Sequence, residues 1–423
     1  MTPLPPRRYH KLHEQLLLSP TFSLLIGWLC SVVVPLALYW APNSMFAPNR
    51  GQQIAIAATT IAFVLSHLAV RRLADAYPGG RSAGFIASQV VATYLLVVVV
   101  ILLLRVEVSR LILVSSGLAA LVWFHIEYIV GSRYRRPKLA VIGGGMANEV
   151  LALDDIDARL LGRLDLQGKR YDGVVADFNA ISPDVERFLT DCALKRTAVY
   201  DAKMIYESFT GRVKINRMSE NNIGSLLPSP IFERVKVMID WLMVMVALPV
   251  VVPVGLIAAV LIKLESPGPV IYTQTRIGRG NKPFKIYKFR SMRFDREASE
   301  QFAGEEDPRI TRVGRVIRKL RIDELPQFVN ILLGDMSLIG PRPEQPSFVA
   351  EFDRQIPFYS YRHVVKPGIT GWAQVRHGYA ADADETRVKI EHDFYYIKNC
   401  SLSLDLFIVF LTIKTIITGF GAR

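Results

Sequence analysis

Two adjacent carboxylates, Asp323 and Glu324, follow a basic segment and precede a short apolar pattern. Apolar residues recur there at the spacing of one helix face: Leu325, Phe328, Val329 and Leu332. Pro326 is tolerated only in the first turn of a helix, and Gly334 is well placed to end one. The pattern predicts a helix that begins near the acidic pair. Such a pair is either an ordinary helix cap, worth ~1 kcal/mol, or part of a reactive site.

The turn Gly340-Pro341-Arg342-Pro343 presents an arginine between two prolines that restrict the backbone. The planar guanidinium of arginine matches phosphate oxygens with two parallel hydrogen bonds. A carboxylate nucleophile at a helix N-terminus with fixed cations nearby suits phosphoryl transfer, because the cations offset its repulsion from an anionic phosphate. Mg²⁺ would act in the same way, and Glu324 is a suitable oxygen ligand for it.

Further cations lie upstream of the acidic pair. The segment 284–290 predicts a strand, in which Lys288 and Arg290 project from the same face because side chains alternate. Two neighbouring cations need solvent or an anion between them, so this segment is either a solvated basic edge or part of a phosphate site. Two further cations near the acidic pair are Arg318 and Arg342.

The composition indicates a membrane protein with two or three domains. Hydrophobic residues make up 51% of the 423 residues, which is high for a soluble protein. The formal net charge of +13 suits anionic lipid head groups or phosphorylated substrates, and we expect no nucleic-acid partner. The three cysteines stand far apart, which argues against a disulfide scaffold and a structural zinc site.

Four apolar stretches, at about 21–40, 54–70, 85–104 and 111–130, each approach the ~20 residues that cross a bilayer as a helix. Basic residues cluster in the tail 1–20, between the second and third stretches, and after the fourth. The positive-inside rule places these segments in the cytoplasm. We therefore expect four transmembrane helices within 21–131, followed by cytoplasmic domains.

Residues 137–225 change character and predict a small Rossmann-like α/β module. Three buried strands are expected at 138–143, 171–177 and 197–201, with helical segments between them. The glycine turn Gly143-Gly144-Gly145 departs from a dinucleotide-binding fingerprint, because Asn148 stands where a third spaced glycine belongs. The interpretation favoured over dinucleotide binding is a module that binds no cofactor, or one that the sequence does not identify.

A fifth apolar stretch, about 235–262, contains Pro249 and Pro253 near its middle. Proline inside a helix removes a backbone donor, so the helix should kink or break there. Either the helix spans the membrane, or it turns back and leaves the C-terminal part in the cytoplasm; the Lys- and Arg-rich C-terminal part favours the re-entrant form. In the last stretch, 402–420, Asp405 and Lys414 make a sixth span less favoured than an interfacial or a core helix.

Taken together, these motifs resemble the bacterial sugar transferase family, the polyprenyl-phosphate hexose-1-phosphate transferases. The likeness runs from about residue 232 to the C-terminus, and the matching motifs keep the family's order. They are Ser266–Pro269, Lys285–Met292, Asp307–Gly314, Asp323–Gln327, Gly334–Ser337, Gly340–Pro343 and Lys366–Trp372. The four N-terminal spans and the Rossmann-like module are similar to those of the larger members, which start exopolysaccharide, capsule or O-antigen repeat units.

The resemblance implies a fold and a mechanism. The fold is an α+β membrane protein with a re-entrant helix at 235–264 and a mostly helical catalytic domain, 232–423, on the cytoplasmic face of the bacterial inner membrane. Asp323 would attack a UDP-sugar, release UMP and carry the phosphosugar until undecaprenyl phosphate accepts it. Glu324 would hold Mg²⁺, and the predicted phosphate-binding residues are Lys288, Arg290, Arg318 and Arg342. Lys288, Arg290 and Arg342 match family positions that either contact phosphate or are structurally essential. Pro253, with Pro249 second, would kink the membrane helix. Large members also suggest a homo-oligomer.

Three alternatives stay open at this point. A dinucleotide-using membrane oxidoreductase would be built on residues 137–225, and a non-catalytic scaffold for polysaccharide assembly would tolerate loss of Asp323. A conventional glycosyltransferase would release UDP instead of UMP. The sequence does not select the sugar, and glucose and galactose both fit.

Overall fold

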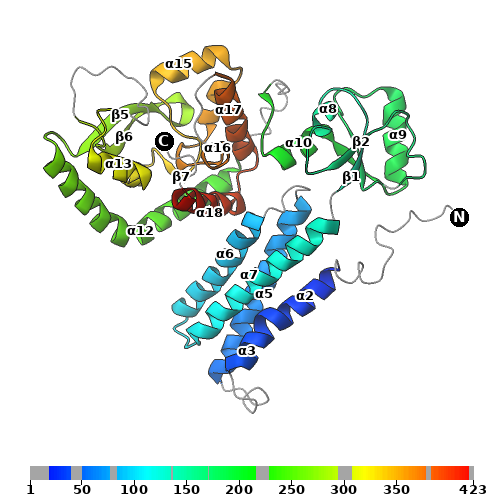
Figure 1. Cartoon of the computed structure of the whole chain (residues 1–423), viewed down its shortest axis with the longest axis horizontal. Coiled ribbons are helices and arrows are strands. Elements are labelled where there is room, and N and C mark those ends of the chain that lie inside the picture. Colours follow the sequence, from blue (N-terminus) through cyan, green and yellow to red (C-terminus); the bar gives the residue numbers. More distant parts are fainter. Residues whose placement is uncertain are drawn as a thin grey trace. The chain divides into compact units, whose positions relative to one another are not determined.

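The computed structural model describes residues 19–39, 50–76, 83–134, 137–169, 171–215, 228–293, 307–377 and 383–418. The chain divides into two compact units between Gly211 and Arg212, and each is described by itself. The first unit holds a helical bundle and a small α/β module, and the second is the C-terminal α+β domain (Figure 1). Most of the predicted cytoplasmic tail, 1–18, lies outside the described residues.

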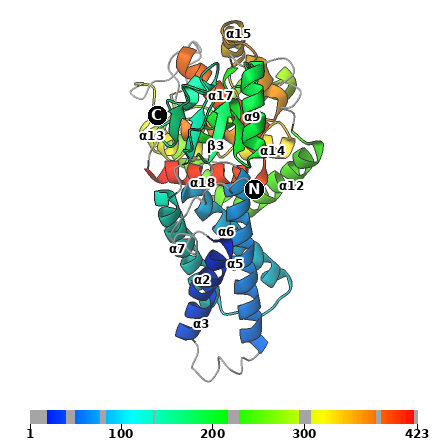
Figure 2. The same ribbon diagram turned by 90° about the vertical axis from the view of Figure 1, so that its right-hand side faces the viewer.

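Four long helices coincide with the four predicted apolar stretches, and both views show them running together (Figures 1 and 2). The first is Pro20–Tyr39, in which a π-helical turn, η1 (Leu29–Val33), joins α2 (Pro20–Trp28) to α3 (Val34–Tyr39). The others are α5 (Arg50–Ala76), α6 (Ala83–Leu103) and α7 (Arg110–Tyr134). Among the described residues, five helices are long and apolar enough to cross a membrane, and these are four of them.

The bundle has an apolar outer surface and scattered polar pairs inside. Tyr94 and Ser116 hydroxyls lie 2.9 Å apart between α6 and α7, and Trp28 donates to Thr60 at 3.1 Å. Hydrogen bonds of this kind join helices in membranes, where lipid offers polar groups no alternative partner. Outward-facing residues such as Leu96 are more than half exposed. This distribution is that of a membrane protein.

The α/β module is a four-stranded parallel sheet in the order β2-β1-β3-β4. Its strands are β1 (Lys138–Val141), β2 (Asp157–Leu160), β3 (Gly173–Ala176) and β4 (Ala198–Asp201). Helices α8 (Ala147–Val150) and α10 (Ala202–Thr210) cover one face, and α9 (Pro183–Leu194) covers the other. The three predicted strands are present. Strand β2 was not predicted, because it is an edge strand that lacks a continuous apolar run.

The glycine turn of the module is occupied by the protein's own carboxylate. The backbone N–H of Met146 donates to Asp177 Oδ2 at 2.8 Å, and Gly145 adopts φ +53°. A Cβ added to Gly145 would lie 2.1 Å from the same oxygen. A phosphate bound at such a turn would need this amide and this space. The arrangement therefore favours the interpretation that the turn binds no dinucleotide.

The second unit places two small sheets among seven helices of the described chain. The hairpin is β5 (Ile271–Ile277) and β6 (Pro283–Phe289), and the parallel pair is β7 (Ser337–Ile339) and β8 (Gly368–Thr370). The helices are α12 (Pro230–Glu265), α13 (Arg312–Lys319), α14 (Gln327–Leu333), α15 (Pro346–Gln355), α16 (Trp372–Arg376), α17 (Ala383–Lys398) and α18 (Leu402–Thr418). Short 3-10 turns are η4 (Arg279–Asn281), η5 (Ile322–Glu324) and η6 (Tyr359–Val364).

Helix α12 continues through both Pro249 and Pro253 without a break, and Figure 1 shows it bent near its middle. Its two arms pack on the same domain. Val244 of the first arm joins a core cluster with Ile286 of β6. Ile262 of the second arm joins a cluster with Phe289, at the end of the same strand.

Helix α18 is a core helix, one of the three possibilities left by its sequence. Leu404, Phe407 and Ile408 are buried. Asp405, the charge that counted against a membrane span, is also buried and accepts hydrogen bonds from Lys236 at 2.6 Å and Tyr396 at 2.8 Å. An acidic side chain can be buried here because both partners satisfy its oxygens.

Candidate active site

The acidic pair lies at the entry to α14. Asp323 and Glu324 form a 3-10 turn after Arg321, whose φ is +53°. Pro326 is the N-cap residue of α14, and Gly334 ends the helix in the left-handed conformation with φ +88°. The predicted order of acidic turn, proline, helix and glycine is confirmed. The α-helix itself begins at Gln327, because the residues before it adopt the tighter turn.

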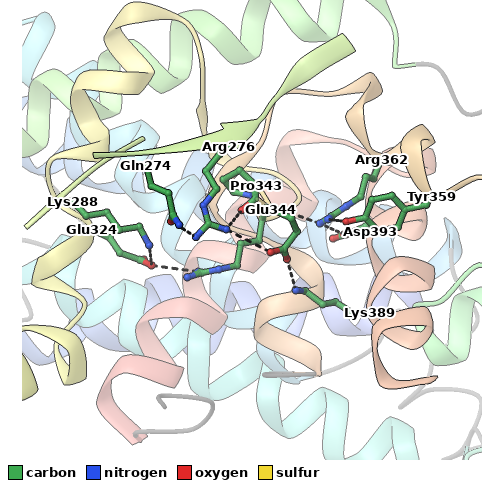
Figure 3. A network of polar contacts seen from close by, with 11 residues as sticks. Gln274, Arg276, Lys288, Glu324, Pro343, Glu344, Tyr359, Arg362, Lys389 and Asp393 are labelled. Atoms are coloured by element: carbon green, nitrogen blue, oxygen red, sulfur yellow. Dashed lines mark hydrogen bonds and ion pairs between the residues drawn. The ribbon is translucent and has the colours of Figure 1, made fainter. Parts of the chain in front are cut away.

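Glu324 is only 7% exposed and faces three cations. Its carboxylate lies 3.3 Å from Arg342 Nη1, 3.7 Å from Arg321 Nη1 and 3.8 Å from Lys288 Nζ. Burial works against ionisation, but Arg342, Lys288 and Arg321 outweigh it and hold the pKa of Glu324 below its ordinary value. Glu324 is therefore a fixed anion that gathers the basic side chains at one point (Figure 3).

Asp323 has a different environment from its neighbour. Its carboxylate has neither a hydrogen bond nor an ion pair to another residue in the described part of the chain. Burial, followed by the charge of Glu324, raises the pKa of Asp323 to about 6, although Lys288, Arg342 and Arg318 act in the opposite direction. An unpaired carboxylate of raised basicity beside cations is the arrangement that a carboxylate nucleophile needs.

The cation Lys288 comes from β6 and is buried against the acidic pair. Burial, together with repulsion from Arg342, lowers the pKa of Lys288 to about 8, so its ammonium is held in an unfavourable environment. An anionic phosphate placed beside Lys288 and Arg342 would relieve this repulsion. The predicted grouping of Lys288 and Arg342 around the acidic pair is what the structure shows, whereas their role in binding phosphate remains a prediction.

Arg342 is presented by the turn Gly340–Pro343, which follows β7 and lies against the loop before β8. The N–H of Gly340 donates to the carbonyl of Thr370, and the N–H of Gly368 donates to the carbonyl of Pro341, both at 2.9 Å. A Cβ on Gly340 would lie 2.4 Å from the carbonyl oxygen of Lys366. The two glycines thus allow two backbones to meet directly, and this contact fixes the turn.

Arg290 occupies a position different from the one expected. It is buried, and its guanidinium donates to the carbonyls of Pro267 at 2.5 Å and Ser266 at 2.8 Å. Arg290 therefore stabilises the turn Ser266–Pro269 after α12, which fits the structurally essential role that the resemblance also allowed and not contact with substrate phosphate. Alternation in β6 placed Arg290 with Lys288, but β6 ends at Phe289. Arg318, in the last turn of α13, acts on Asp323 by its charge alone.

A Mg²⁺ ion would have few protein ligands here. Among the described residues, no group of three His, Cys, Asp or Glu side chains could hold a metal. Mg²⁺ is often bound by one or two carboxylates together with substrate phosphates and waters, so the pair Asp323 and Glu324 fits that mode. Glu324 is the better candidate, because its pKa is lowered and it stays charged.

Several polar residues around the site escaped the sequence analysis (Figure 3): Gln274, Arg276, Glu344, Tyr359, Arg362, Lys389 and Asp393. Gln274 and Arg276 could have been found, because β5 pairs with β6 so that Tyr272 lies opposite Lys288. Residues two and four positions further along β5 share the face of Lys288. Between Arg362 and Asp393 the chain forms β8, α16 and the first part of α17, so no local spacing indicates that the two residues pair.

Comparison with known proteins finds a matching family and several relatives. A family described as "Bacterial sugar transferase" matches residues 231–419. The chain is 49% identical over 420 residues, 99% of both chains, to the UDP-N-acetylgalactosamine-undecaprenyl-phosphate N-acetylgalactosaminephosphotransferase of Aeromonas hydrophila. It is 38% identical over 220 residues to the UDP-glucose:undecaprenyl-phosphate glucose-1-phosphate transferase of Escherichia coli K12, covering 50% of this chain and 47% of the relative.

A third relative aligns with less than half of this chain but over most of its own length. The exopolysaccharide production protein PSS of Rhizobium leguminosarum is 43% identical over 180 residues, which is 41% of this chain and 90% of the relative. The matched family region contains the acidic pair, the basic residues around it and α12. The chain belongs to the bacterial sugar transferase family, and the resemblance seen in its motifs is confirmed.

Proposed function

We propose that this protein transfers a sugar-1-phosphate from a UDP-sugar to undecaprenyl phosphate and releases UMP. The observation that carries the proposal is the unpaired Asp323 carboxylate beside Glu324, Lys288 and Arg342 in a member of this family. Two of the relatives named above are, by their names, transferases of sugar phosphate to undecaprenyl phosphate. The reaction would be an early membrane step of surface polysaccharide synthesis.

The proposed chemistry has two displacements. An oxygen of Asp323 attacks the phosphorus that bears the sugar, the bond to the bridging oxygen breaks, and UMP leaves with that electron pair. The phosphosugar is then bound to Asp323 as an acyl phosphate. A phosphate oxygen of undecaprenyl phosphate attacks the same phosphorus, the bond to Asp323 breaks, and the carboxylate is restored.

The surrounding cations lower the barrier to both displacements. Lys288 and Arg342 are placed to balance charge on the phosphate oxygens, which is more effective in a buried site than in water. Mg²⁺ held by Glu324 would add positive charge at the diphosphate. Charge neutralisation of this kind allows one anion to attack another.

The donor sugar is proposed from the relative that aligns along the whole chain. That relative's name specifies N-acetylgalactosamine, whereas several relatives that align over about half of this chain or less are named for glucose. We therefore propose UDP-N-acetylgalactosamine as the donor, in preference to the glucose or galactose expected from the sequence. The N-acetylgalactosamine relative matches both units of the chain, so its name is the more informative one.

The test of the function is nucleotide release by the purified protein with Mg²⁺, undecaprenyl phosphate and a panel of UDP-sugars. Release of UMP, with UDP-N-acetylgalactosamine the most active donor, is the expected result. Release of UDP would mean conventional glycosyl transfer and would contradict the proposed chemistry. UMP release with another donor would keep the chemistry and reject the sugar. Absence of release with every donor would favour the non-catalytic scaffold.

We also propose that α12 enters and leaves the membrane on the cytoplasmic side. Lys236, near its start, pairs with Asp405, and Glu265, at its end, accepts from the backbone N–H groups of Arg312 and Val313 at 2.7 and 2.9 Å. Asp240, on the first arm, is buried and accepts from Ser337 Oγ at 2.7 Å. A straight helix of 36 residues would be ~54 Å long, too long for both ends to meet one small domain without a bend.

Cysteine labelling would test this topology. Ser229 and Lys263 are exposed near the two ends of α12, and each is replaced by cysteine in a background without native cysteines. Both positions should react with a membrane-impermeant thiol reagent in inverted vesicles, and neither should react in spheroplasts. Labelling of the two positions from opposite sides would show that α12 spans the membrane. Positions in the bundle loops would serve as orientation controls.

The pH dependence of the first displacement should follow the two perturbed groups. Asp323 must be deprotonated to attack, so the rate should fall as pH drops below its pKa of about 6. Lys288 must be charged to balance the phosphate, so the rate should also fall above its pKa of about 8. The measurement is single-turnover formation of the phosphosugar-enzyme from labelled UDP-sugar. The acceptor is omitted, so that ionisation of its phosphate does not contribute to the pH dependence. Lys288→Arg should remove the alkaline limb, and a limb that persists would refute this assignment.

A further inference from the structure

The turn that presents Arg342 is held by two other arginines, one on each side of it (Figure 3). Arg362 Nη2 donates to the carbonyl of Arg342 at 2.9 Å. Arg276 Nη1 donates to the carbonyl of the next residue, Pro343, at 3.2 Å. Two successive carbonyls of one turn are therefore bound by guanidinium groups that come from distant parts of the sequence, β5 and η6.

The guanidinium of Arg362 is buried and makes further hydrogen bonds besides the one to the turn. It is 2% exposed and donates to Asp393 Oδ2 at 2.7 Å and to Tyr359 at 3.0 Å. The Asp393 carboxylate, itself 2% exposed, lies on α17. Breaking a buried charged pair is strongly unfavourable, because it leaves a charge buried without its partner. Arg362 thus ties the backbone of Arg342 to helix α17 in a defined position.

Arg276 holds the other side of the turn through a second set of partners. It donates to Gln274 at 2.8 Å and lies 3.7 Å from Glu344, the residue after Pro343. Glu344 is buried and also pairs with Lys389 of α17 at 2.8 Å. The second arginine therefore connects the turn to β5, the partner strand of the strand that carries Lys288.

We propose that Arg276 and Arg362 are positioning residues for catalysis, which clamp the Gly340–Pro343 turn so that the Arg342 guanidinium points at Glu324 and at the donor diphosphate. The inference builds on the function proposed above, in which Arg342 acts on phosphate. Neither arginine needs to touch the substrate. Their effect is to remove the conformational freedom that a side chain on an irregular turn would otherwise have, since electrostatic stabilisation depends on donors being already in place.

The experiment uses full-length protein and the variants Arg362→Lys and Arg276→Lys. Each keeps the positive charge and removes the planar fork that binds a turn carbonyl and other groups at once. Arg212→Lys is the matched control. Arg212 also pairs with a buried carboxylate of α17, Glu391, which stands two residues before Asp393, and has no contact with the turn in the described part of the chain.

Both clamp variants are expected to reduce kcat for UMP release about ten-fold or more, while the Arg212 control stays within about two-fold of wild type. Thermal unfolding of each variant is measured in parallel. If Arg362→Lys or Arg276→Lys unfolds at a lower temperature than wild type but keeps full kcat per folded molecule, the arginine has a purely structural role and the proposal is overturned. Should Arg362→Lys fail to fold, Arg276→Lys, whose side chain is less enclosed, still decides the question.

A double-mutant cycle tests whether the clamp acts through Arg342. In an Arg342→Ala background, Arg362→Lys should lose most of its effect on kcat, because the group that it positions is absent. Equal effects in both backgrounds would contradict positioning of Arg342. The same cycle is repeated with the dissociation constant of UDP as the measured quantity, because UDP is a diphosphate that cannot act as a donor. If wild type releases no UMP but the binding cycle is non-additive, the proposed function fails and the clamp stands.

Discussion

Asp323→Asn is expected to abolish UMP release and formation of the phosphosugar-enzyme, with a loss of about 10³-fold or more in kcat. The amide keeps the shape of the carboxylate, but its oxygen is a poor nucleophile. In wild type, the carboxylate has no hydrogen bond or ion pair within the described residues that would reduce its reactivity, and Lys288 and Arg342 lie close by. The measurements are nucleotide release and trapping of radiolabelled sugar on protein.

The same substitution should leave the fold intact, which separates loss of chemistry from loss of structure. Asp323 has a pKa of about 6 in the folded protein against 3.8 as the reference value. A folded pKa above the unfolded value means that the charged carboxylate opposes folding at pH above about 6, by an amount on the order of 1–3 kcal/mol. Asp323→Asn removes that cost, so its melting temperature at neutral or alkaline pH should equal or exceed that of wild type.

Two outcomes would contradict this account. Retention of substantial UMP release would exclude Asp323 as the attacking group and favour direct transfer between the two substrates. Loss of activity together with a lower melting temperature would make Asp323 a structural residue. Glu324→Gln is the informative companion, because it also removes an acidic group but leaves three cations without their shared partner, and it should destabilise the domain.

Gly368→Ala is expected to reduce the stability of the C-terminal domain strongly, although it adds only one methyl group. The new Cβ would lie 2.1 Å from the backbone N of Gly340 and 2.5 Å from the carbonyl oxygen of Thr370. Backbone atoms cannot move away as a flexible side-chain end can. The β7–β8 pairing and the Gly340–Pro343 turn must separate, which should cost about 3 kcal/mol or more and displace Arg342.

The measurement is thermal or denaturant unfolding of the detergent-purified protein, together with its rate of UMP release. Gly255→Ala is the control, because its Cβ would be no closer than 3.5 Å to Phe289 and it lies inside a helix, where alanine is favoured. We expect Gly255→Ala to be neutral or slightly stabilising. Wild-type stability and activity in Gly368→Ala would show that the Gly340–Pro343 turn and β8 do not need direct backbone contact.

The sequence by itself determined the family, the order of the parts and which residues are proposed for the chemistry. The hydropathy of the N-terminal third fixed four long helices, since a bilayer-length apolar stretch has few other stable forms. The acidic pair, its proline and Gly334 specified a local turn and helix through backbone preferences that act over a few residues. The prolines on both sides of Arg342 also restrict the backbone locally, so the sequence alone singles out this arginine.

Only the tertiary structure decided which basic residues lie beside the acidic pair. Strand alternation predicted that Lys288 and Arg290 share one face of β6. In the structure, Lys288 faces Glu324, whereas Arg290 is buried against the Ser266–Pro269 turn, because the strand ends at Phe289, between the two residues. Arg362 and Asp393 became partners only through the packing of η6 on α17. Local spacing cannot encode such pairs, since the burial that makes a charge depend on one partner arises when distant segments meet.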